Sequence, residues 1–563
     1  MEVSQRRPTR AQDVPDGELV PDELDIELFR HACSSILDEI ELNLTRTAYS
    51  PLIYDYKDYV VGLLDNSFAL LSQSELSLPA FVADLGPVVA DAVGVVRAEN
   101  LAPGDVLVSN YAAAQGHHLN NVVMIAPIFQ EDRVIAYVAI RGHWADVGGL
   151  EPGSMSWNAR DIHQEGTQYR GLRIMRAGEI VHENVATCLA NTRFEEYVRG
   201  DLMAQLGGCQ LGLSRWQERI TSRWTCEEVE AFTSAQMGQS ATLARSRVAA
   251  LPDGAFTATC RTDDAGVPGT DPLQFTVRVE IDGDRMIIDL TAVPDQVEAP
   301  INSNAAVGDA RVAYKSVIAP DHPTDEGLFA PLEVRTRPGS ILTASKGAAM
   351  GHWNSTMPTV VDLVLQAFGT CSSDLAPAGH HASIGGFIFS GRRPDGSWWQ
   401  SVDTAGGGWG ASSRADGFSP LRTLSHGDNR SISVEVLEGS FPLTVEHVRY
   451  RPDTGGRGRY RGGCGVERLI TTNEDAYLTT SVERTLDPPW GVAGGEPGVP
   501  GGVDVCVPGA DTWVAYNKAS SVALPAGSRV RIRSAGGGGW GPPADRDPAA
   551  HAADLRDGFV TKL

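Results

Sequence analysis

The residues best suited to chemistry are concentrated between Asp55 and Glu165. Four of the 13 histidines of the chain lie between residues 117 and 163. They stand beside carboxylates and amides in the segments QGHHLNN (115–121), RGHWADVGG (141–149) and DIHQEG (161–166). Imidazole combined with carboxylate is the ligand set expected for Zn, Mn or Fe. The pattern therefore predicts a metal site in this part of the chain.

The spacing within HWAD gives this prediction a structural setting. His143 and Asp146 are three residues apart, where a predicted strand runs into Gly148-Gly149. Glycine lets a backbone turn sharply around an ion at such a strand end. The alternative is a stretch without function: His117 would lie on the surface, His118 and His143 would be buried and hydrogen-bonded, and Asp146 would cap a turn.

The elements that would position these residues are readable from hydrophobic periodicity. Apolar residues at spacings of three and four predict a helix over 26–44, with Asp22 or Asp25 as its cap and Pro51 as its end. A hairpin is predicted around Asp65-Asn66. Further strands are predicted over residues 104–111 and 122–129 and within 133–149, where the strand runs into a glycine loop.

The second half of the chain changes character. After a helical stretch from about 195 to 250, alternating residues around Asp282-Gly283 predict a hairpin. Residues 356–369 are predicted to be helical, short strands follow from about 384, and the last residues form one short helix. The expected fold class is α+β and multi-domain. We expect a mobile tail (1–21), a mixed α/β metal-site domain (22–250), a β-rich domain (251–350) and a mixed, mainly β region (351–563).

Composition excludes several classes of function. The formal net charge of −24 disfavours binding to nucleic acid and to anionic membranes. No apolar run is long enough to span a membrane, and the N-terminus lacks the apolar core of a secretory signal. None of the 8 cysteines forms a CxxC pair. Reduced thiols in a cytoplasmic protein are therefore expected.

Other polar or glycine-rich motifs are less specific. AGGGWGA (405–411) and GGGGWG (536–541) lack the Lys-Ser/Thr of a P-loop, and Pro542-Pro543 follows the second one. Tight backbone packing or a turn is favoured over nucleotide binding. His352, His380 and His381 would be either polar pocket residues or loop residues. No GxSxG motif is present, so a stand-alone hydrolase is disfavoured.

Taken together, these segments resemble the hydantoinase B/oxoprolinase family, which includes the alpha subunits of acetone carboxylase and related acetophenone carboxylase subunits. DYKDYVVGLLD resembles the family segment RxDFSxAL-x-D, with Asp58 at the acidic position. QGHHLNN is similar to GGTHxPD, with His118 at the family histidine. GHWADVGG, PGSM and QEG are similar to the block HHxDxGG…PGSM…EG. Similar segments extend from ELFRHACSSILDEIELNLTRTAYS near the start to RVRIRSAGGGGWGPPADRD near the end.

The resemblance implies a divided enzyme. A hydantoinase A-type partner subunit would bind ATP, and this chain would carry a divalent metal (Zn, Mn or Fe) in a hetero-oligomer. The reaction would be hydrolysis of a cyclic amide (hydantoin, oxoproline or lactam) or carboxylation of a ketone. The implied metal ligands are Asp58, His118, His143 and Asp146, with His163 as a further candidate. Asp58 or Asp146 would act as a base if it is not a ligand.

The chain also departs from the family pattern. Asn121 stands where many hydantoinases have Asp, Asn120 replaces Pro, His117 replaces Thr, and Trp144 replaces a second His. HWADVGG favours the carboxylase-like branch. The change at Asn121 motivates the alternative of a non-catalytic structural or regulatory subunit with a degenerate metal site. For the partner interface, the sequence offers three tryptophans that would otherwise pack within their own domain: Trp409, Trp490 and Trp540.

Overall fold

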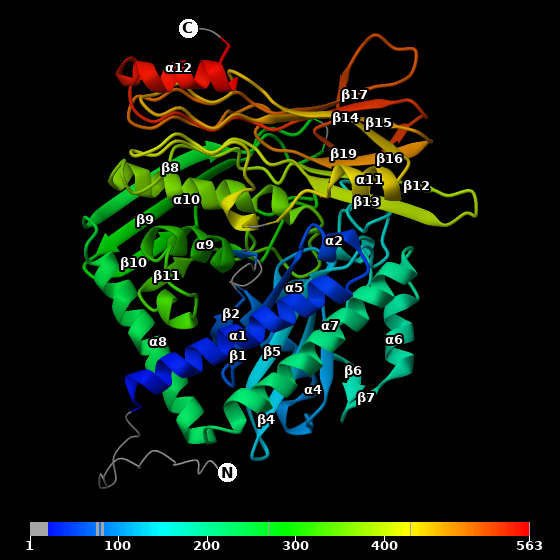
Figure 1. Cartoon of the computed structure of the whole chain (residues 1–563), viewed down its shortest axis with the longest axis vertical. Helices are drawn as coiled ribbons and strands as arrows, with labels where there is room; N and C mark the ends of the chain where they lie inside the picture. Colours follow the sequence, from blue (N-terminus) through cyan, green and yellow to red (C-terminus); the bar gives the residue numbers. More distant parts are fainter. Residues whose placement is uncertain (1–20, 75–77, 80–83, 268, 428, 562–563) are drawn as a thin grey trace, which may run out of the picture.

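The fold is mixed α/β, with several domains and several sheets (Figure 1). The computed structural model describes residues 21–74, 78–79, 84–267, 269–427 and 429–561. The predicted mobile tail lies outside these residues apart from Pro21, as does part of the predicted helix-rich segment 78–99. In the described part of the chain, no helix is both long and apolar enough to cross a lipid bilayer.

The helices cluster on either side of the sheets. They are α1 (Glu23–Thr47), α2 (Pro51–Tyr54), α4 (Leu85–Val96), α5 (Ala112–Gln115), α6 (His182–Leu189), α7 (Glu195–Trp216), α8 (Cys226–Val248), α9 (Ala306–Ile318), α10 (Met357–Cys371), α11 (Val434–Ser440) and α12 (Pro548–Asp557).

The strands of the first half are β1 (Tyr59–Asp65), β2 (Leu70–Gln73), β3 (Val106–Ser109), β4 (Asn121–Gln130), β5 (Arg133–His143), β6 (Leu172–Arg176), β7 (Glu179–Ile180), β8 (Gly254–Arg261), β9 (Gln274–Asp282), β10 (Arg285–Asp289) and β11 (Leu332–Arg335). Those of the second half are β12 (Gly386–Arg392), β13 (Trp398–Thr404), β14 (Leu443–Tyr450), β15 (Val466–Thr472), β16 (Ala476–Ser481), β17 (Gly502–Cys506), β18 (Val514–Ala515), β19 (Lys518–Leu524) and β20 (Arg529–Arg533).

The large sheet has the strand order β2-β1-β5-β4-β3-β6-β7, and every neighbouring pair in it is antiparallel. Its central strands are buried on both faces, which explains why β4 and β5 are apolar almost throughout rather than alternating. Val61 and Leu63 pack against α1 and α7 on one face. Val60 and Leu64 pack with α4 on the other. The large sheet is therefore a well-packed support for the side chains at the ends of its strands.

Helix α1 confirms the periodicity read from the sequence. Its buried residues fall at spacings of three and four, and the Asp22 side chain accepts a hydrogen bond from the Leu24 amide at the N-terminus. The predicted end at Pro51 is wrong. The helix ends at Thr47, and Pro51 instead starts α2, where its missing amide proton costs nothing.

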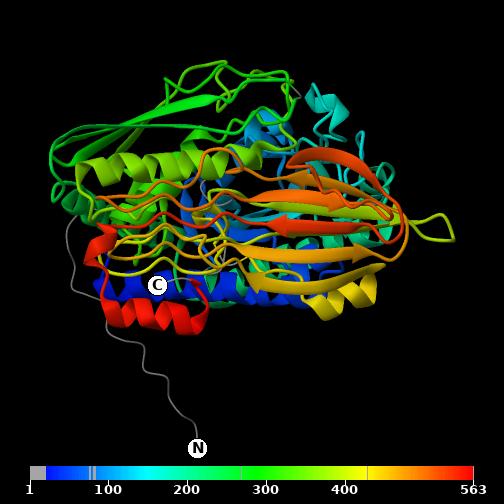
Figure 2. The ribbon, with the colours of Figure 1, turned by 90° about the horizontal axis from the view of Figure 1, so that it is seen from above.

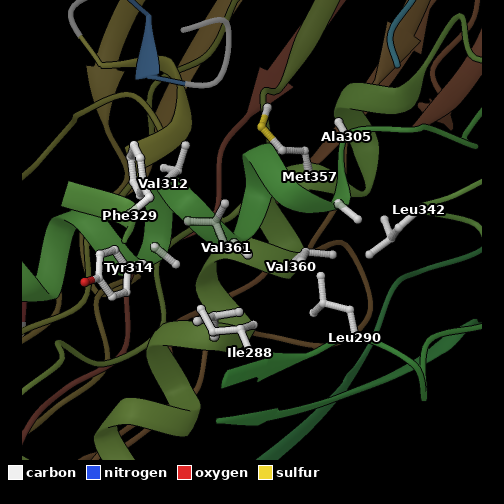
Figure 3. Close-up of a cluster of buried hydrophobic side chains, with 14 of the residues drawn as sticks. Ile288, Leu290, Ala305, Val312, Tyr314, Phe329, Leu342, Met357, Val360 and Val361 are labelled. Carbon is white, nitrogen blue, oxygen red and sulfur yellow. The ribbon is translucent and has the colours of Figure 1, made fainter. Parts of the chain in front are cut away.

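A second sheet, β11-β10-β9-β8, contains the predicted hairpin at Asp282-Gly283. Helix α10, also predicted, packs against this sheet together with α9 (Figure 3). Ile288 of β10 and Leu290, just after that strand, meet Val360 and Val361 of α10 in this core. The same hydrophobic cluster continues into the large sheet. It therefore includes residues on both sides of the predicted domain boundaries at residues 250 and 350, and these boundaries stay predictions.

The C-terminal region is mainly β, as expected, and forms the sheets β13-β12-β16-β19 and β14-β15-β20-β17-β18. Beside them, extended glycine-rich segments lie side by side, close to α10 and α12 (Figure 2). We call these segments the glycine layer: 405–411, 455–465, 491–498 and 536–541. A Cβ at Gly537 would lie 2.0 Å from the Trp409 carbonyl oxygen, and one at Gly408 would lie 2.0 Å from that of Gly463. The glycine runs thus serve tight backbone packing.

Candidate functional site

The candidate site lies at one edge of the large sheet. Asp58 immediately precedes β1, His143 ends β5 and Asn121 begins β4. Because these strands are antiparallel neighbours in the order β1-β5-β4, the start of β1, the end of β5 and the start of β4 meet at the same edge. The backbone amide of His143 donates to the carbonyl oxygen of Asp58 at 3.0 Å. The register of the sheet therefore brings together residues that are far apart in the sequence.

Three predicted ligands converge here. The imidazole rings of His118 and His143 stand perpendicular, with centroids 4.9 Å apart. His143 Nδ1 is 3.6 Å from Asp58 Oδ2. His118 Nδ1 lies 3.2 Å from the carbonyl oxygen of Gly351, an arrangement in which Nδ1 carries the proton. That hydrogen bond leaves Nε2 of His118 with its lone pair available.

A cavity of about 50 Å³ opens in front of these three side chains. That volume is enough for a few water-sized groups. His352 also lines the cavity, stacked on Trp157 with ring centroids 4.0 Å apart. Apolar side chains complete the wall and limit access of water: Met155, Trp353, Ile384, Phe387, Ile388 and Val402.

Burial governs the protonation of these groups. It raises the pKa of Asp58 to about 7. Burial, reinforced by the neighbouring His117, lowers the pKa of His118 to about 4. Burial together with His118 puts the pKa of His143 well below its usual value. The imidazoles are therefore neutral near pH 7, which is the form that binds metals.

The donor atoms fit a divalent cation in their chemistry. Asp58 Oδ1, His118 Nε2 and both ring nitrogens of His352 are buried and form no hydrogen bond of normal geometry within the described residues. Such orphaned polar atoms are costly unless something binds them. As positioned, no three His, Cys, Asp or Glu side chains of the described residues are close enough to surround an ion. The oxygen and nitrogen donors of Asp58, His118 and His143 are nevertheless those that Zn, Mn or Fe prefer.

The structure places the other predicted ligands elsewhere. Asp146 is buried but engaged: it accepts hydrogen bonds from the Ser154 hydroxyl at 2.8 Å and the Arg193 amide at 2.7 Å. Its contact with the Arg193 guanidinium, at 3.1 Å, fixes the loop that follows β5. His163 is exposed in a short 3₁₀ turn. Neither lines the cavity.

His117 is buried, contrary to the surface position that the alternative interpretation gave it. Its Nε2 lies 2.5 Å from Asp84, which also accepts from Arg141 at 2.7 Å, and its ring stacks on Trp353 at 4.2 Å. Burial opposes ionisation of Asp84, but the charge of Arg141 and the contact with His117 outweigh it and lower its pKa. We call Asp84, His117 and Arg141 the buried ion cluster.

Glu165 supports the site from behind. One of its carboxylate oxygens accepts the amides of Met350 and Gly351, at 2.8 and 2.7 Å. Gly351 is the residue whose carbonyl oxygen orients His118. Glu165 therefore acts as a positioning residue, because it reaches the cavity only through the Gly351 backbone.

Asn121 lies beside the site, at the position where the resemblance to hydantoinases would place an Asp. Its Nδ2 is 3.4 Å from His117 Nδ1, its side chain also interacts with His118, and its Oδ1 has no hydrogen-bond partner among the described residues. The amide oxygen of Asn121 can still coordinate a cation, but this oxygen carries no formal negative charge.

The motifs considered for nucleotides and partners have structural roles. The glycine layer buries its amides in hydrogen bonds between segments, such as Gly537 N to Gly463 O, rather than presenting them to a phosphate. Trp409 and Trp540 donate their indole N–H groups within the C-terminal region, to Arg422 O and Ser373 O. Trp490 lies against Arg484. The three tryptophans thus pack largely within their own region.

Some residues of the cavity carry little signal in the sequence. His352 is one of several loop histidines there, although the aromatic residue beside it in GHWNST hints at a buried pocket. Tyr56, Asp403, Thr404 and His426 also line the cavity. No local pattern marks Asp403, Thr404 and His426, which come from strands and loops distant in sequence, whereas Tyr56 lies inside the segment DYKDYVVGLLD that contains Asp58.

Comparisons with known proteins agree with this architecture. The hydantoinase B/oxoprolinase family profile matches residues 22–543. The putative B-type subunit of a D-/L-hydantoinase from Pseudomonas sp. (strain NS671) is 25% identical over 96% of this chain and 93% of its own. The beta subunit of the caprolactamase of Pseudomonas jessenii is 27% identical, over 96% of this chain and 94% of its own.

Solved structures show the same fold. The ATP-dependent caprolactamase of Pseudomonas jessenii superposes with a TM-score of 0.89 at 24% identity, covering 96% of this chain and 95% of that chain. A nucleotide-free acetone carboxylase gives a TM-score of 0.85 at 17% identity, covering 95% and 78%. Because the family profile spans nearly the whole described chain, this chain belongs to the hydantoinase B/oxoprolinase family and is an enzyme subunit of that type.

Proposed function

We propose that this chain is the metal-bearing subunit of an ATP-dependent enzyme that opens a cyclic amide, in complex with a hydantoinase A-type subunit that binds ATP. The observation that carries the proposal is the cavity at the sheet edge, where Asp58, His118 and His143 meet. Asp58 Oδ1 and His118 Nε2 have no hydrogen-bond partner there among the described residues. A hydantoin, an oxoproline or another lactam presents a compact carbonyl group that suits so small a cavity.

The proposed metal ligands are Asp58, His118 and His143. Asp146 and His163 are not part of this set, because Asp146 is bonded to Arg193 and Ser154 and His163 is exposed. When bound, a divalent Zn, Mn or Fe ion would polarise a carbonyl oxygen or acidify a water molecule. Asn121 lowers the negative charge near the site, but the carboxylate of Asp58 remains.

The protein side chains would orient the substrate and control protons. The apolar wall excludes bulk water, which strengthens every electrostatic interaction inside the cavity. His352 is neutral near pH 7, because burial lowers the pKa of its imidazole to about 3, and it can donate or accept one hydrogen bond toward the substrate. Trp157 fixes the plane of the His352 ring by stacking on it.

Two features support a divided enzyme. In the described residues, the glycine layer is closed on itself by backbone hydrogen bonds and offers no phosphate cradle. The relatives include proteins named as the B-type or beta subunits of their enzymes. An activated carbonyl intermediate passed between subunits would need a water-tight contact, which predicts an extensive interface.

The test is reconstitution with an A-type subunit. The metal-loaded complex is assayed for ATP hydrolysis with hydantoin, 5-oxoproline and caprolactam, and in a separate arm with acetone and bicarbonate. Ring-opened product formed together with ADP supports the proposal. Carboxylated ketone instead supports the second candidate, which the HWADVGG segment favours. Separate elution of the two chains, or a stable complex with no substrate-stimulated turnover, contradicts the proposal and leaves a non-catalytic role.

A further inference from the structure

A second, larger pocket lies beside the metal cavity and has the opposite charge to the rest of the molecule. Its volume is about 590 Å³, within the range of small-molecule sites. Among the described residues that line it, every charged side chain is an arginine: Arg422, Arg430, Arg449 and Arg468. The chain as a whole carries a net charge of −24. We call this site the arginine pocket.

Two of these arginines share one carboxylate. Arg468 and Arg422 both contact Asp403, which is fully buried, so the three side chains together retain one positive charge. Arg422 is further fixed by hydrogen bonds to the carbonyl oxygens of Thr404 and Asn429. These contacts make the inner wall of the pocket rigid.

The other two arginines form the outer wall. Arg449 is exposed and pairs with Glu467, at 2.6 Å. The guanidinium of Arg430 has no carboxylate partner within the described residues, and the residue is exposed. The pocket therefore presents guanidinium groups that acidic side chains only partly neutralise.

The arginine pocket adjoins the metal cavity directly. Thr404 lines both, and its hydroxyl is 3.0 Å from the hydroxyl of Tyr56, which lines the cavity. Asp403 lies in the cavity wall while contacting the arginines behind it. A layer of side chains that includes Thr404 and Asp403 thus stands between the two spaces.

The remaining lining of the arginine pocket is largely apolar: Pro420, Leu421, Val448, Tyr450, Val466 and Ile532. Apolar side chains next to guanidinium groups suit an organic molecule that carries an oxyanion. Guanidinium groups bind phosphate and carboxylate by paired hydrogen bonds, with more geometric specificity than lysine.

We propose that the arginine pocket binds the oxyanion of a small organic molecule and holds that molecule beside the metal cavity, next to the layer that contains Thr404 and Asp403. The role at the cavity rests on the proposed function, whereas oxyanion binding does not. A phosphorylated substrate arriving from the ATP-binding partner and a carboxylate product leaving the cavity share this chemistry.

The first experiment measures binding of inorganic phosphate and of acetate to the metal-free full chain by isothermal titration calorimetry. Arg430→Ala removes a guanidinium that makes no ion pair in the described structure, so the fold should persist. Binding of the preferred anion should weaken about ten-fold, and Arg430→Lys should recover part of it. The matched control is Arg285→Ala, an equal loss of charge at an exposed side chain, the first residue of β10.

Tighter binding of phosphate points to the phosphorylated substrate, and tighter binding of acetate points to the product. The inference is overturned if the wild-type chain binds neither anion. It is equally overturned if Arg285→Ala weakens binding as much as Arg430→Ala, because general charge would then explain the effect.

A second experiment separates this inference from the proposed function. In the reconstituted complex, Arg430→Ala should raise the KM for the organic substrate about ten-fold and leave the metal content unchanged. An active complex with an unaltered KM refutes the role beside the cavity. An inactive wild-type complex whose metal-free chain still binds phosphate through Arg430 refutes the proposed function and leaves the oxyanion site standing.

Discussion

His117 and His118 are neighbours in the chain, yet they belong to opposite kinds of site. His117 lies in the buried ion cluster, where its Nε2 contacts Asp84, which Arg141 also binds, and where Trp353 covers its ring. His118 faces the cavity with Nε2 unsatisfied among the described residues, and Asp58 there also keeps an unsatisfied oxygen. The two adjacent histidines thus differ in their surroundings. The fold engages the ring of His117 in the buried ion cluster, and it leaves a ring nitrogen of His118 available to the proposed metal.

The largest expected effect comes from removing one of the proposed metal ligands. His143→Ala should abolish metal binding and reduce activity of the reconstituted complex by at least about a thousand-fold, because one of three donors is lost. Metal content is measured by mass spectrometry on the purified chain and activity by product formation. His163→Ala is the matched control and should keep full metal content, since His163 lies outside the cavity. Full metal content in the His143 variant would contradict the assignment.

A substitution in the buried ion cluster should instead lower the stability of the folded protein. Asp84→Ala leaves Arg141 buried without its carboxylate, and the expected loss is about 3–5 kcal/mol in the free energy of unfolding. Urea denaturation monitored by circular dichroism measures it. The surviving folded protein should still bind metal. Loss of metal without loss of stability would show that the two histidine sites are not separate.

A substitution of Glu165 tests the proposed metal site indirectly, because Glu165 reaches His118 only through the backbone of Gly351. Glu165→Ala should weaken metal binding about 10- to 100-fold, the usual cost of losing a group that orients a ligand. Glu165→Gln should restore much of the affinity, because burial raises the pKa of Glu165 to about 8 and the native side chain is already largely neutral near pH 7. Equal losses in both variants would argue against a positioning role.

The smallest expected effect is a difference in pH dependence between Asp58 and Asp84. Burial raises the folded pKa of Asp58 to about 7, above its unfolded value, so protonation stabilises the metal-free fold and this contribution is lost as the pH rises through about 7. Relative to Asp58→Asn, the free energy of unfolding of the wild-type chain should fall by about 1 kcal/mol as the pH rises from about 6 to about 7.5.

Asp84 supplies the contrast. Its pKa is lowered, so its contribution is present above the unfolded pKa and is lost only as the pH falls below about 4. The stability difference between wild type and Asp84→Asn should therefore stay constant between about pH 6 and pH 7.5. Parallel slopes for the Asp58 and Asp84 variants in denaturant titrations would contradict the contrast.

Local patterns predicted much of this molecule. Periodicity located α1, a helix was expected where α10 lies, and alternation located the hairpins. The family motifs pointed to Asp58, His118, His143 and Asp146, and the fold brings the first three of these to one cavity at the sheet edge. The buried ion cluster and the arginine pocket were not predicted. Asp84, His117 and Arg141 come together only because β4, β5 and α4 pack around them, and Arg422 meets Arg468 only through the C-terminal sheets. Such long-range pairings leave no signature in a window of neighbouring residues.

The glycine layer has a consequence for how the chain reaches its native state. Its hydrogen bonds join segments far apart in sequence, as in Gly538 N to Gly379 O and Gly539 N to Glu496 O. The long loops between these segments must close before the contacts can form, and closing them costs conformational entropy. A layer in which most residues are glycine also offers less apolar surface for early collapse than the neighbouring sheets do. The layer should therefore form late, after the sheets beside it have condensed, and its amides should acquire protection from hydrogen exchange last during refolding.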